Sequence, residues 1–188
     1  LMKIAREPLL IESRRLGPYV VRDPEDGVVL DLMIHDLDII LSLVNSPIRE
    51  MRAVGRSVVS SREDLATVQI WFANGCLATL AASRVTQHKI RTMAVTQKDA
   101  YIFLNYTDQD IHIHRQASSH HTLTREELRY ATGSFVERVF VHKENPLKQE
   151  LRHFVECARN GKDPLGLHSE LYSLKVALEI QDMVRKGL

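Results

Sequence analysis

Long hydrophobic runs, cysteines and an excess of either charge are all scarce in this chain of 188 residues, and each shortage excludes a class of protein. No apolar stretch approaches the roughly 20 residues that span a bilayer, and the first residues lack the apolar core of a signal peptide. The 25 basic and 24 acidic residues leave a net charge of +1, which indicates neither a nucleic acid nor a membrane surface as a partner.

The low cysteine content bears on the cellular compartment. Cys76 and Cys157 are too few for a disulfide framework, so we expect two buried thiols in a protein of the reducing cytoplasm. Hydrophobic residues make up 44% of the chain, which is enough for a globular core at this length. Because no repeat, low-complexity tract or linker interrupts the sequence, we expect residues 1–188 to form one domain.

What the chain does contain is an unusual apolar stretch at residues 27–45, which reads Gly-Val-Val-Leu-Asp-Leu-Met-Ile-His-Asp-Leu-Asp-Ile-Ile-Leu-Ser-Leu-Val-Asn. We interpret Leu32 to Val44 as one buried helix, entered from a short apolar run at Val28 to Leu30. At about 100° per residue, its polar residues other than Asp36 fall in one stripe roughly 80° wide: Asp31, His35, Asp38, Ser42 and Asn45. Surface helices usually present a broad face rich in Lys, Arg and Glu, so this narrow stripe predicts the wall of a cavity.

Asp31 and His35 are the chemically interesting pair of the stripe, because residues four apart are neighbours on a helix. A carboxylate beside an imidazole orients the ring and raises its basicity, which suits a general base acting on an alcohol. Two other interpretations stay open on the helical wheel alone. Asp31 could cap a helix whose stripe faces water, or Asp31, His35 and Asp38 could bind a metal ion.

Further along the chain the hydrophobic period changes to two, which indicates β-strands. Asn74-Gly75 is a strong hairpin signal between two of them, and Asn145-Pro146 begins a closing pair of helices. We expect strands at 9–16, 48–60, 65–73, 76–85, 91–97, 100–106, 110–114 and 135–141, a loop within 117–133, and helices at 145–160 and 169–186. This order predicts an α+β fold with a largely antiparallel, open-faced sheet and helices packed on one face.

The stretch around Asp31 and His35 also resembles a known family. Oxidoreductases of the Gfo/Idh/MocA family, which includes glucose–fructose oxidoreductase and inositol dehydrogenase, carry Gly-x-x-x-Asp-x-x-x-His-Asp in their C-terminal domains, and here this pattern falls on Gly27, Asp31, His35 and Asp36. The residues Lys143 to Leu147 and Asn160 to Leu165 are similar to the closing helix pair of the family. The resemblance implies that His35 exchanges the proton of a substrate hydroxyl and that Asp31 helps to bind and orient a sugar or polyol.

The same resemblance makes two absences informative. The chain has neither the Gly-x-Gly-x-x-Gly fingerprint of a dinucleotide-binding domain nor the Glu-Lys-Pro motif of the family. We therefore expect a fragment that corresponds to the C-terminal domain of a longer enzyme, whose NAD or NADP is bound mainly by the missing N-terminal domain. The fragment alone is expected to bind no cofactor and to be inactive.

Other polar residues are candidates for substrate binding or metal binding. Asp38 belongs to the stripe, and Arg14 or Arg15 could approach an anionic group from the end of the first strand. A basic cluster formed by Arg84, Lys89 and Arg91 could hold a phosphate, which would favour a nucleotide sugar, although surface solvation also explains it. Four histidines could bind zinc but lack a cysteine or acid at ligand spacing, so we predict no metal site: His112, His114, His120 and His121.

From these residues and the resemblance we expect the substrate-binding and catalytic-base domain of an NAD(P)-dependent dehydrogenase. Its substrate would be a secondary alcohol of a sugar, nucleotide sugar or cyclitol. The main alternative is a non-catalytic oligomerisation or scaffold domain with a vestigial sugar site. Because most strands look apolar on both faces, the open face of the sheet is expected to pair in a homo-dimer or tetramer under either interpretation.

Overall fold

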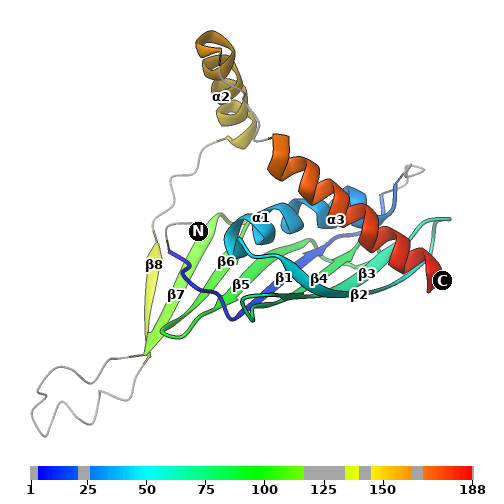
Figure 1. The fold of residues 1–188 in the computed structure, drawn as a ribbon, viewed down its shortest axis with the longest axis horizontal. Coiled ribbons are helices and arrows are strands. Elements are labelled where there is room, and N and C mark those ends of the chain that lie inside the picture. The colour runs from blue at the N-terminus through cyan, green and yellow to red at the C-terminus, as the bar shows by residue number, and fades with distance from the viewer. Residues whose placement is uncertain (1–3, 21–25, 117–133, 140–144, 162–166, 188) are drawn as a thin grey trace, which may run out of the picture.

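One sheet of eight strands organises the residues that the computed structural model describes, which are 4–20, 26–116, 134–139, 145–161 and 167–187 (Figure 1). In chain order the strands are β1 (Leu10–Leu16), β2 (Ile48–Arg56), β3 (Leu65–Phe72), β4 (Leu77–Ser83), β5 (Ile90–Thr96), β6 (Ala100–Asn105), β7 (Asp110–Gln116) and β8 (Ser134–Val139). They lie side by side in the order β2-β3-β4-β1-β5-β6-β7-β8. Every neighbouring pair is antiparallel except β1 and β4, which confirms the predicted α+β class with a largely antiparallel sheet.

The hairpin between β3 and β4 forms where Asn74-Gly75 predicted it. Gly75 has a φ of +88°, which a residue with a side chain adopts only at a cost. The backbone N–H of Cys76 donates to the Asn74 side chain at 3.1 Å, and the N–H of Phe72 donates to the carbonyl of Cys76 at 2.9 Å. These local bonds close the turn and set the register between the two strands.

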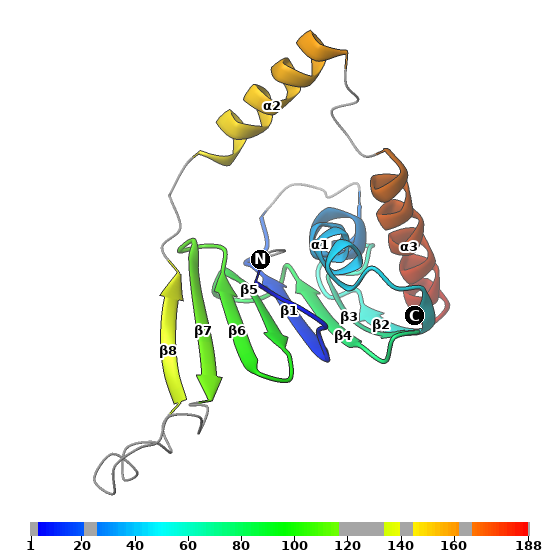
Figure 2. The same cartoon turned by 60° about the vertical axis from the view of Figure 1, so that its left-hand side comes forward.

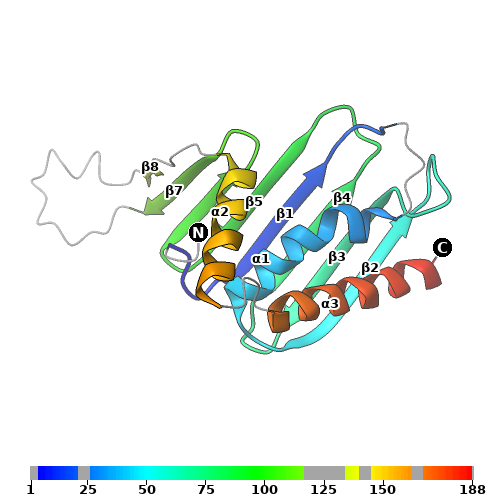
Figure 3. The ribbon, with the colours of Figure 1, turned by 90° about the horizontal axis from the view of Figure 1, so that it is seen from above.

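A short π-helical turn, η1 (Val29–Met33), leads into the helix α1 (Ile34–Val44), and two further helices, α2 (Pro146–Asn160) and α3 (Leu167–Lys186), close the chain. The Asn145 side chain caps α2 by accepting from the N–H of Lys148, as its sequence predicted. α1 and α3 lie together on one face of the sheet, as Figures 2 and 3 show. No helix in the described part of the chain is both long and apolar enough to cross a bilayer.

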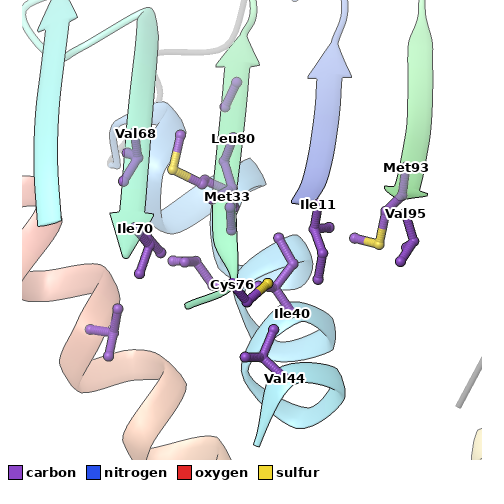
Figure 4. Close-up of a cluster of buried hydrophobic side chains, with 14 of the residues drawn as sticks. Ile11, Met33, Ile40, Val44, Val68, Ile70, Cys76, Leu80, Met93 and Val95 are labelled. Carbon is purple, nitrogen blue, oxygen red and sulfur yellow. The ribbon is translucent and has the colours of Figure 1, made fainter. Parts of the chain in front are cut away.

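The hydrophobic core lies between α1, α3 and the central strands. Figure 4 shows Ile40 of α1 and Met33 of η1 directed toward Ile11 and Leu80 of the sheet. All four of these side chains are at most 2% exposed. Burying side chains of this size supplies most of the free energy that holds a helix on a sheet. The core therefore fixes the position of the segment that carries Asp31 and His35.

The closing helices leave many of their apolar residues uncovered. On α3, Val176, Ala177 and Ile180 are buried, but Leu171, Leu174 and Leu178 are exposed. On α2 the apolar positions are also exposed: Leu147, Leu151, Phe154 and Val155. In Figures 1 and 2, α2 stands away from the sheet. Helical periodicity shows where apolar residues recur, but it does not indicate which of them another element covers.

The face of the sheet opposite the helices is less apolar than the sequence suggested. Burial alternates along β3, where Ala66, Val68 and Ile70 are buried and the residues between them are the exposed Thr67 and Gln69. On β1 the exposed residues are Glu12 and Arg14. The prediction that most strands are apolar on both faces is therefore wrong for β1 and β3. Pairing of two copies through this face stays a prediction without that premise.

Candidate functional site

The segment with Asp31 and His35 begins as a π turn rather than an α-helix. The prediction placed an apolar run at Val28 to Leu30 and a helix from Leu32, whereas the structure has helical backbone from Val29 onward. The start is tied down by the backbone, since the N–H of Val28 donates to the Glu63 carbonyl and the N–H of Asp31 to that of Gly27, both at 3.0 Å. Because π turns are rare and frequently occur at functional sites, this local departure is itself informative.

At position 27, the first of the motif, close packing leaves no room for a side chain. A Cβ added to Gly27 would collide with the carboxylate of Glu63. Glu63 is only 1% exposed, and its carboxylate accepts a hydrogen bond from the Gln181 amide at 3.5 Å. The side chain of Glu63 is therefore enclosed and has little room to move aside. Gly27 lets the start of η1 approach the loop before β3.

We expect Gly27→Ala to lower the free energy of unfolding by about 1–3 kcal/mol, because the added methyl group overpacks an enclosed carboxylate. Gly17→Ala is the matched control, since a Cβ at Gly17 meets no atom within 4 Å, and it should change stability by less than about 0.5 kcal/mol. Denaturant unfolding of both variants, followed by circular dichroism, measures the difference. Equal stability of the two variants would contradict the packing role of Gly27.

The predicted stripe lies on the surface of this chain. Asp31, His35, Ser42 and Asn45 are all exposed, and only Asp38 is partly buried. Asp38 accepts a hydrogen bond from the Ser173 hydroxyl at 2.8 Å, which ties α1 to α3. The prediction that the stripe lines a hollow enclosed by this chain is thus wrong, because α3 and the sheet cover the apolar sides of α1 and leave the polar side open. Asp31 and His35 are both exposed, four positions apart in the sequence.

Beneath the exposed His35, its neighbour Asp36 is buried in a bidentate ion pair. Arg15 of β1 donates from Nε to Asp36 Oδ2 at 2.9 Å and from Nη2 to Oδ1 at 2.7 Å. Burial opposes the charge of Arg15, but the hydrogen bonds to Asp36 outweigh it and raise the pKa of the guanidinium. Burial, together with the charge of Asp36, raises the pKa of the nearby Tyr106 to about 12. Sequence reasoning missed this pair, although Asp36 was the one acid outside the polar stripe.

Arg84, predicted to bind a substrate phosphate, is instead used within the fold. It is 7% exposed and donates from Nε to Asp64 Oδ1 at 2.8 Å and from Nη1 to the carbonyl of Asp26 at 2.9 Å. Burial disfavours the charge of Asp64, but hydrogen bonds from the Ser60 hydroxyl and from three backbone N–H groups hold the pKa of Asp64 well below its usual range. Those donors are the N–H groups of Val58, Val59 and Ser60. The phosphate role of Arg84 is corrected because this network already occupies its guanidinium.

The other two residues predicted to contact the substrate, Arg14 and Lys89, lie in different parts of the fold. Arg14 is exposed on the sheet face opposite α1, since it alternates along β1 with Arg15, which reaches toward Asp36. The structure thus corrects its predicted role and does not bring Arg14 near His35. Lys89 is exposed in the connection between β4 and β5. Of the predicted site residues, Asp31 lies on η1, and His35 and Asp38 lie on α1, which follows it directly. The predicted basic residues do not join them.

The histidine-rich region provides no metal site in the part of the chain that the structure describes. His112 contacts Asp110 at 2.9 Å, and Asp110 also accepts from Arg138 at 2.9 Å. His114 stacks edge-on against Tyr101 with 5.8 Å between ring centroids, while His120 and His121 lie outside the described residues. Among described residues, no three His, Cys, Asp or Glu side chains are grouped to hold a metal ion.

The two thiols, Cys76 and Cys157, are buried as expected, and burial raises the pKa of Cys76 to about 11.

Comparison with known proteins finds a match over the part of the chain that contains Gly27, Asp31, His35 and Asp36. The model of the GFO/IDH/MocA C-terminal domain matches residues 10–102. The UDP-N-acetylglucosamine 3-dehydrogenase of Acidithiobacillus ferrooxidans is 36% identical over 111 residues, which cover 59% of this chain and 36% of that enzyme. Its crystal structure superimposes with a TM-score of 0.82 at 28% identity and covers 96% of this chain and 55% of that one.

More distant structures share the fold. A levoglucosan dehydrogenase in complex with NADH and L-sorbose has a TM-score of 0.75 at 14% identity, covering 96% of this chain and 57% of that one. An aldose–aldose oxidoreductase of Caulobacter crescentus has a TM-score of 0.74 at 16% identity, covering 97% and 55%. The chain thus spans about half the length of these solved relatives. From the matched domain, the shared architecture and the Gly27–Asp31–His35–Asp36 motif, we conclude that this chain belongs to the Gfo/Idh/MocA family through its C-terminal domain.

Proposed function

We propose that this chain is the substrate-binding and catalytic-base part of an NAD(P)-dependent dehydrogenase that oxidises a secondary alcohol of a nucleotide sugar. The observation that carries the proposal is that the exposed Asp31 and His35 stand at the motif positions on η1 and α1, in a chain 36% identical over 111 residues to a UDP-N-acetylglucosamine 3-dehydrogenase. A UDP-linked N-acetylhexosamine is therefore the first substrate to test. Free sugars and cyclitols are the other members of the proposed substrate class.

In the proposed reaction, His35 accepts the proton of the substrate hydroxyl while the carbon that bears this hydroxyl loses a hydride. Asp31 lies about one helical turn away and accepts hydrogen bonds from the sugar or from the imidazole. The exposure of both side chains on this chain leaves them accessible to a substrate. The nicotinamide, when bound, supplies the hydride acceptor.

The described residues do not themselves fit a dinucleotide. A pyrophosphate is usually held by a glycine-rich turn between a strand and a helix N-terminus, and the chain contains no Gly-x-Gly-x-x-Gly. We therefore propose that another part of the full-length protein binds NAD or NADP and covers the open side of α1. The described chain alone should neither bind the cofactor nor turn over substrate.

The alternative proposal is a non-catalytic assembly domain. The observation that favours it is that Asp31 and His35 face solvent instead of a hollow enclosed by this chain. The two proposals make different predictions for the full-length protein, because a scaffold with a vestigial site has no turnover whatever domain covers α1.

The deciding experiment mixes the full-length protein with UDP-N-acetylglucosamine and NAD⁺ or NADP⁺ and follows the absorbance of the reduced nicotinamide. Mass spectrometry should find a product that has lost two hydrogen atoms. N-acetylglucosamine without UDP and a cyclitol, assayed in parallel, identify the substrate class. Turnover with any of these supports the dehydrogenase, and absence of turnover with all of them supports the scaffold.

A further inference from the structure

The buried ion pair beneath His35 has a geometry that a merely stabilising contact does not need. Asp36 follows His35 directly in the chain, and both lie in the first turn of α1. The side chains of Arg15 and Asp36 are only 12% and 4% exposed, and the two hydrogen bonds between them are 2.9 and 2.7 Å long. A planar guanidinium that grips both carboxylate oxygens fixes direction as well as distance.

The ion pair adds a side-chain anchor at the start of α1 to the backbone hydrogen bonds of Val28 and Asp31 at the start of η1. Neither the residue before η1 nor the residue before α1 makes a side-chain capping bond. The π turn ends at Met33, only two residues before His35. A change from π to α spacing at this junction would rotate Asp31 relative to His35. The bond from β1 to Asp36 holds the α-helical side of the junction in place.

Tyr106 lies near the pair. It is partly buried, its hydroxyl contacts the sulfur of Met93 at 3.6 Å, and its pKa responds to the charges of both Asp36 and Arg15. Because both side chains of the ion pair are mostly buried, water screens the attraction between Arg15 and Asp36 less than it would at the surface.

We propose that Arg15 is a positioning residue for the reaction, and that its ion pair with Asp36 sets the direction in which His35 projects from α1. The proposal rests on the proposed function of His35 as the proton acceptor. Arg15 acts only through Asp36 and the backbone of α1. Because misplacing a catalytic group by about 1 Å can cost two orders of magnitude in rate, loss of the anchor should affect turnover more than substrate binding.

The test measures kcat, KM and the unfolding midpoint of the full-length enzyme and four variants. In Arg15→Met we expect kcat to fall by at least about tenfold with KM changed less than about threefold. Arg15→Lys keeps the charge without the bidentate grip, so its kcat should lie between those of Arg15→Met and the wild type. Ile70→Val, a core variant in β3, controls for mild destabilisation and should keep the wild-type kcat.

The double variant Arg15→Met/Asp36→Leu separates positioning from stability. Replacing a buried ion pair by apolar side chains often restores stability, so its unfolding midpoint should return toward the wild type. Its kcat should stay low, because an apolar contact has no fixed direction. Recovery of kcat together with stability would overturn the positioning role, as would a normal kcat in a folded Arg15→Met enzyme. Absence of turnover in the wild type would overturn the proposed function instead, and that result does not depend on any Arg15 variant.

Discussion

His35→Ala in the full-length protein should lower kcat by about 10²–10⁴, the usual contribution of a general acid–base group. The alanine removes the only imidazole of the motif, and with it the proposed proton acceptor. KM should change much less, because His35 is proposed to act on the proton of the hydroxyl that reacts. Steady-state kinetics with the substrate identified by the assay above provide the measurement.

Two controls separate proton transfer from a general effect of losing a histidine. His114→Ala removes an imidazole from the sheet face opposite α1 and should leave kcat unchanged. Added imidazole should restore part of the activity of His35→Ala, because a small base can enter the vacated space. Wild-type turnover in His35→Ala would show that another group accepts the proton.

Asp64→Asn should lower the free energy of unfolding by about 3–5 kcal/mol, the range measured when one partner of a buried ion pair is removed. Asp64 is fully buried and accepts five hydrogen bonds, one of them from Arg84, so every oxygen lone pair is directed at a donor. An asparagine amide would turn its own N–H groups toward the backbone donors or toward Arg84. The buried guanidinium would then lack its negative partner.

Denaturant unfolding of Asp64→Asn against Glu50→Gln tests this expectation. Glu50 also pairs with an arginine, Arg52, at 2.8 Å, but both side chains are exposed, so its loss should cost less than about 1 kcal/mol. Adding Arg84→Met to Asp64→Asn should recover part of the loss, because it removes the stranded charge. Equal stability of Asp64→Asn and Glu50→Gln would contradict the structural role of the network.

The same carboxylate predicts how stability depends on pH. The pKa of Asp64 is lower in the folded protein than its ordinary value of 3.8, so the folded state favours the charged carboxylate of Asp64. Its contribution is complete well above that ordinary value and is lost as the pH falls below about 4. The wild type should therefore lose more stability than Asp64→Asn between about pH 5 and pH 2, when both are unfolded by denaturant at a series of pH values.

Elements with a local cause were predictable from the sequence. The hairpin at Asn74-Gly75 and the cap at Asn145 depend on neighbouring residues alone, so the pattern contains the whole reason for the structure. The motif of Asp31 and His35 could be found because a helical spacing and a family resemblance fall on the same residues. The π turn was missed because a helical wheel assumes one constant rotation per residue.

Contacts between distant segments account for the predictions that were wrong. Arg84 looked like part of a phosphate-binding cluster because Asp64, twenty positions earlier, was not recognised as its partner. Arg15 and Asp36 are likewise separated by twenty-one positions and meet only when α1 packs on β1. The exposed Leu171 and Leu174 have the spacing of core residues, and nothing in their own helix distinguishes them from the buried Ala177.

The central place of β1 has a consequence for how the protein folds. β1 pairs with β4 on one side, where Leu10 lies opposite Leu77, and with β5 on the other, where Leu10 lies opposite Thr96. It therefore joins the strands β2–β4 to the strands β5–β8. β1 thus pairs with two strands that both come after α1 in the sequence, and contacts of such long sequence separation form slowly. Because Arg15 lies on β1 and Asp36 on α1, their ion pair forms only when the helix packs on the strand. The proposed positioning of His35 would then depend on assembly of the sheet and not on the helix alone.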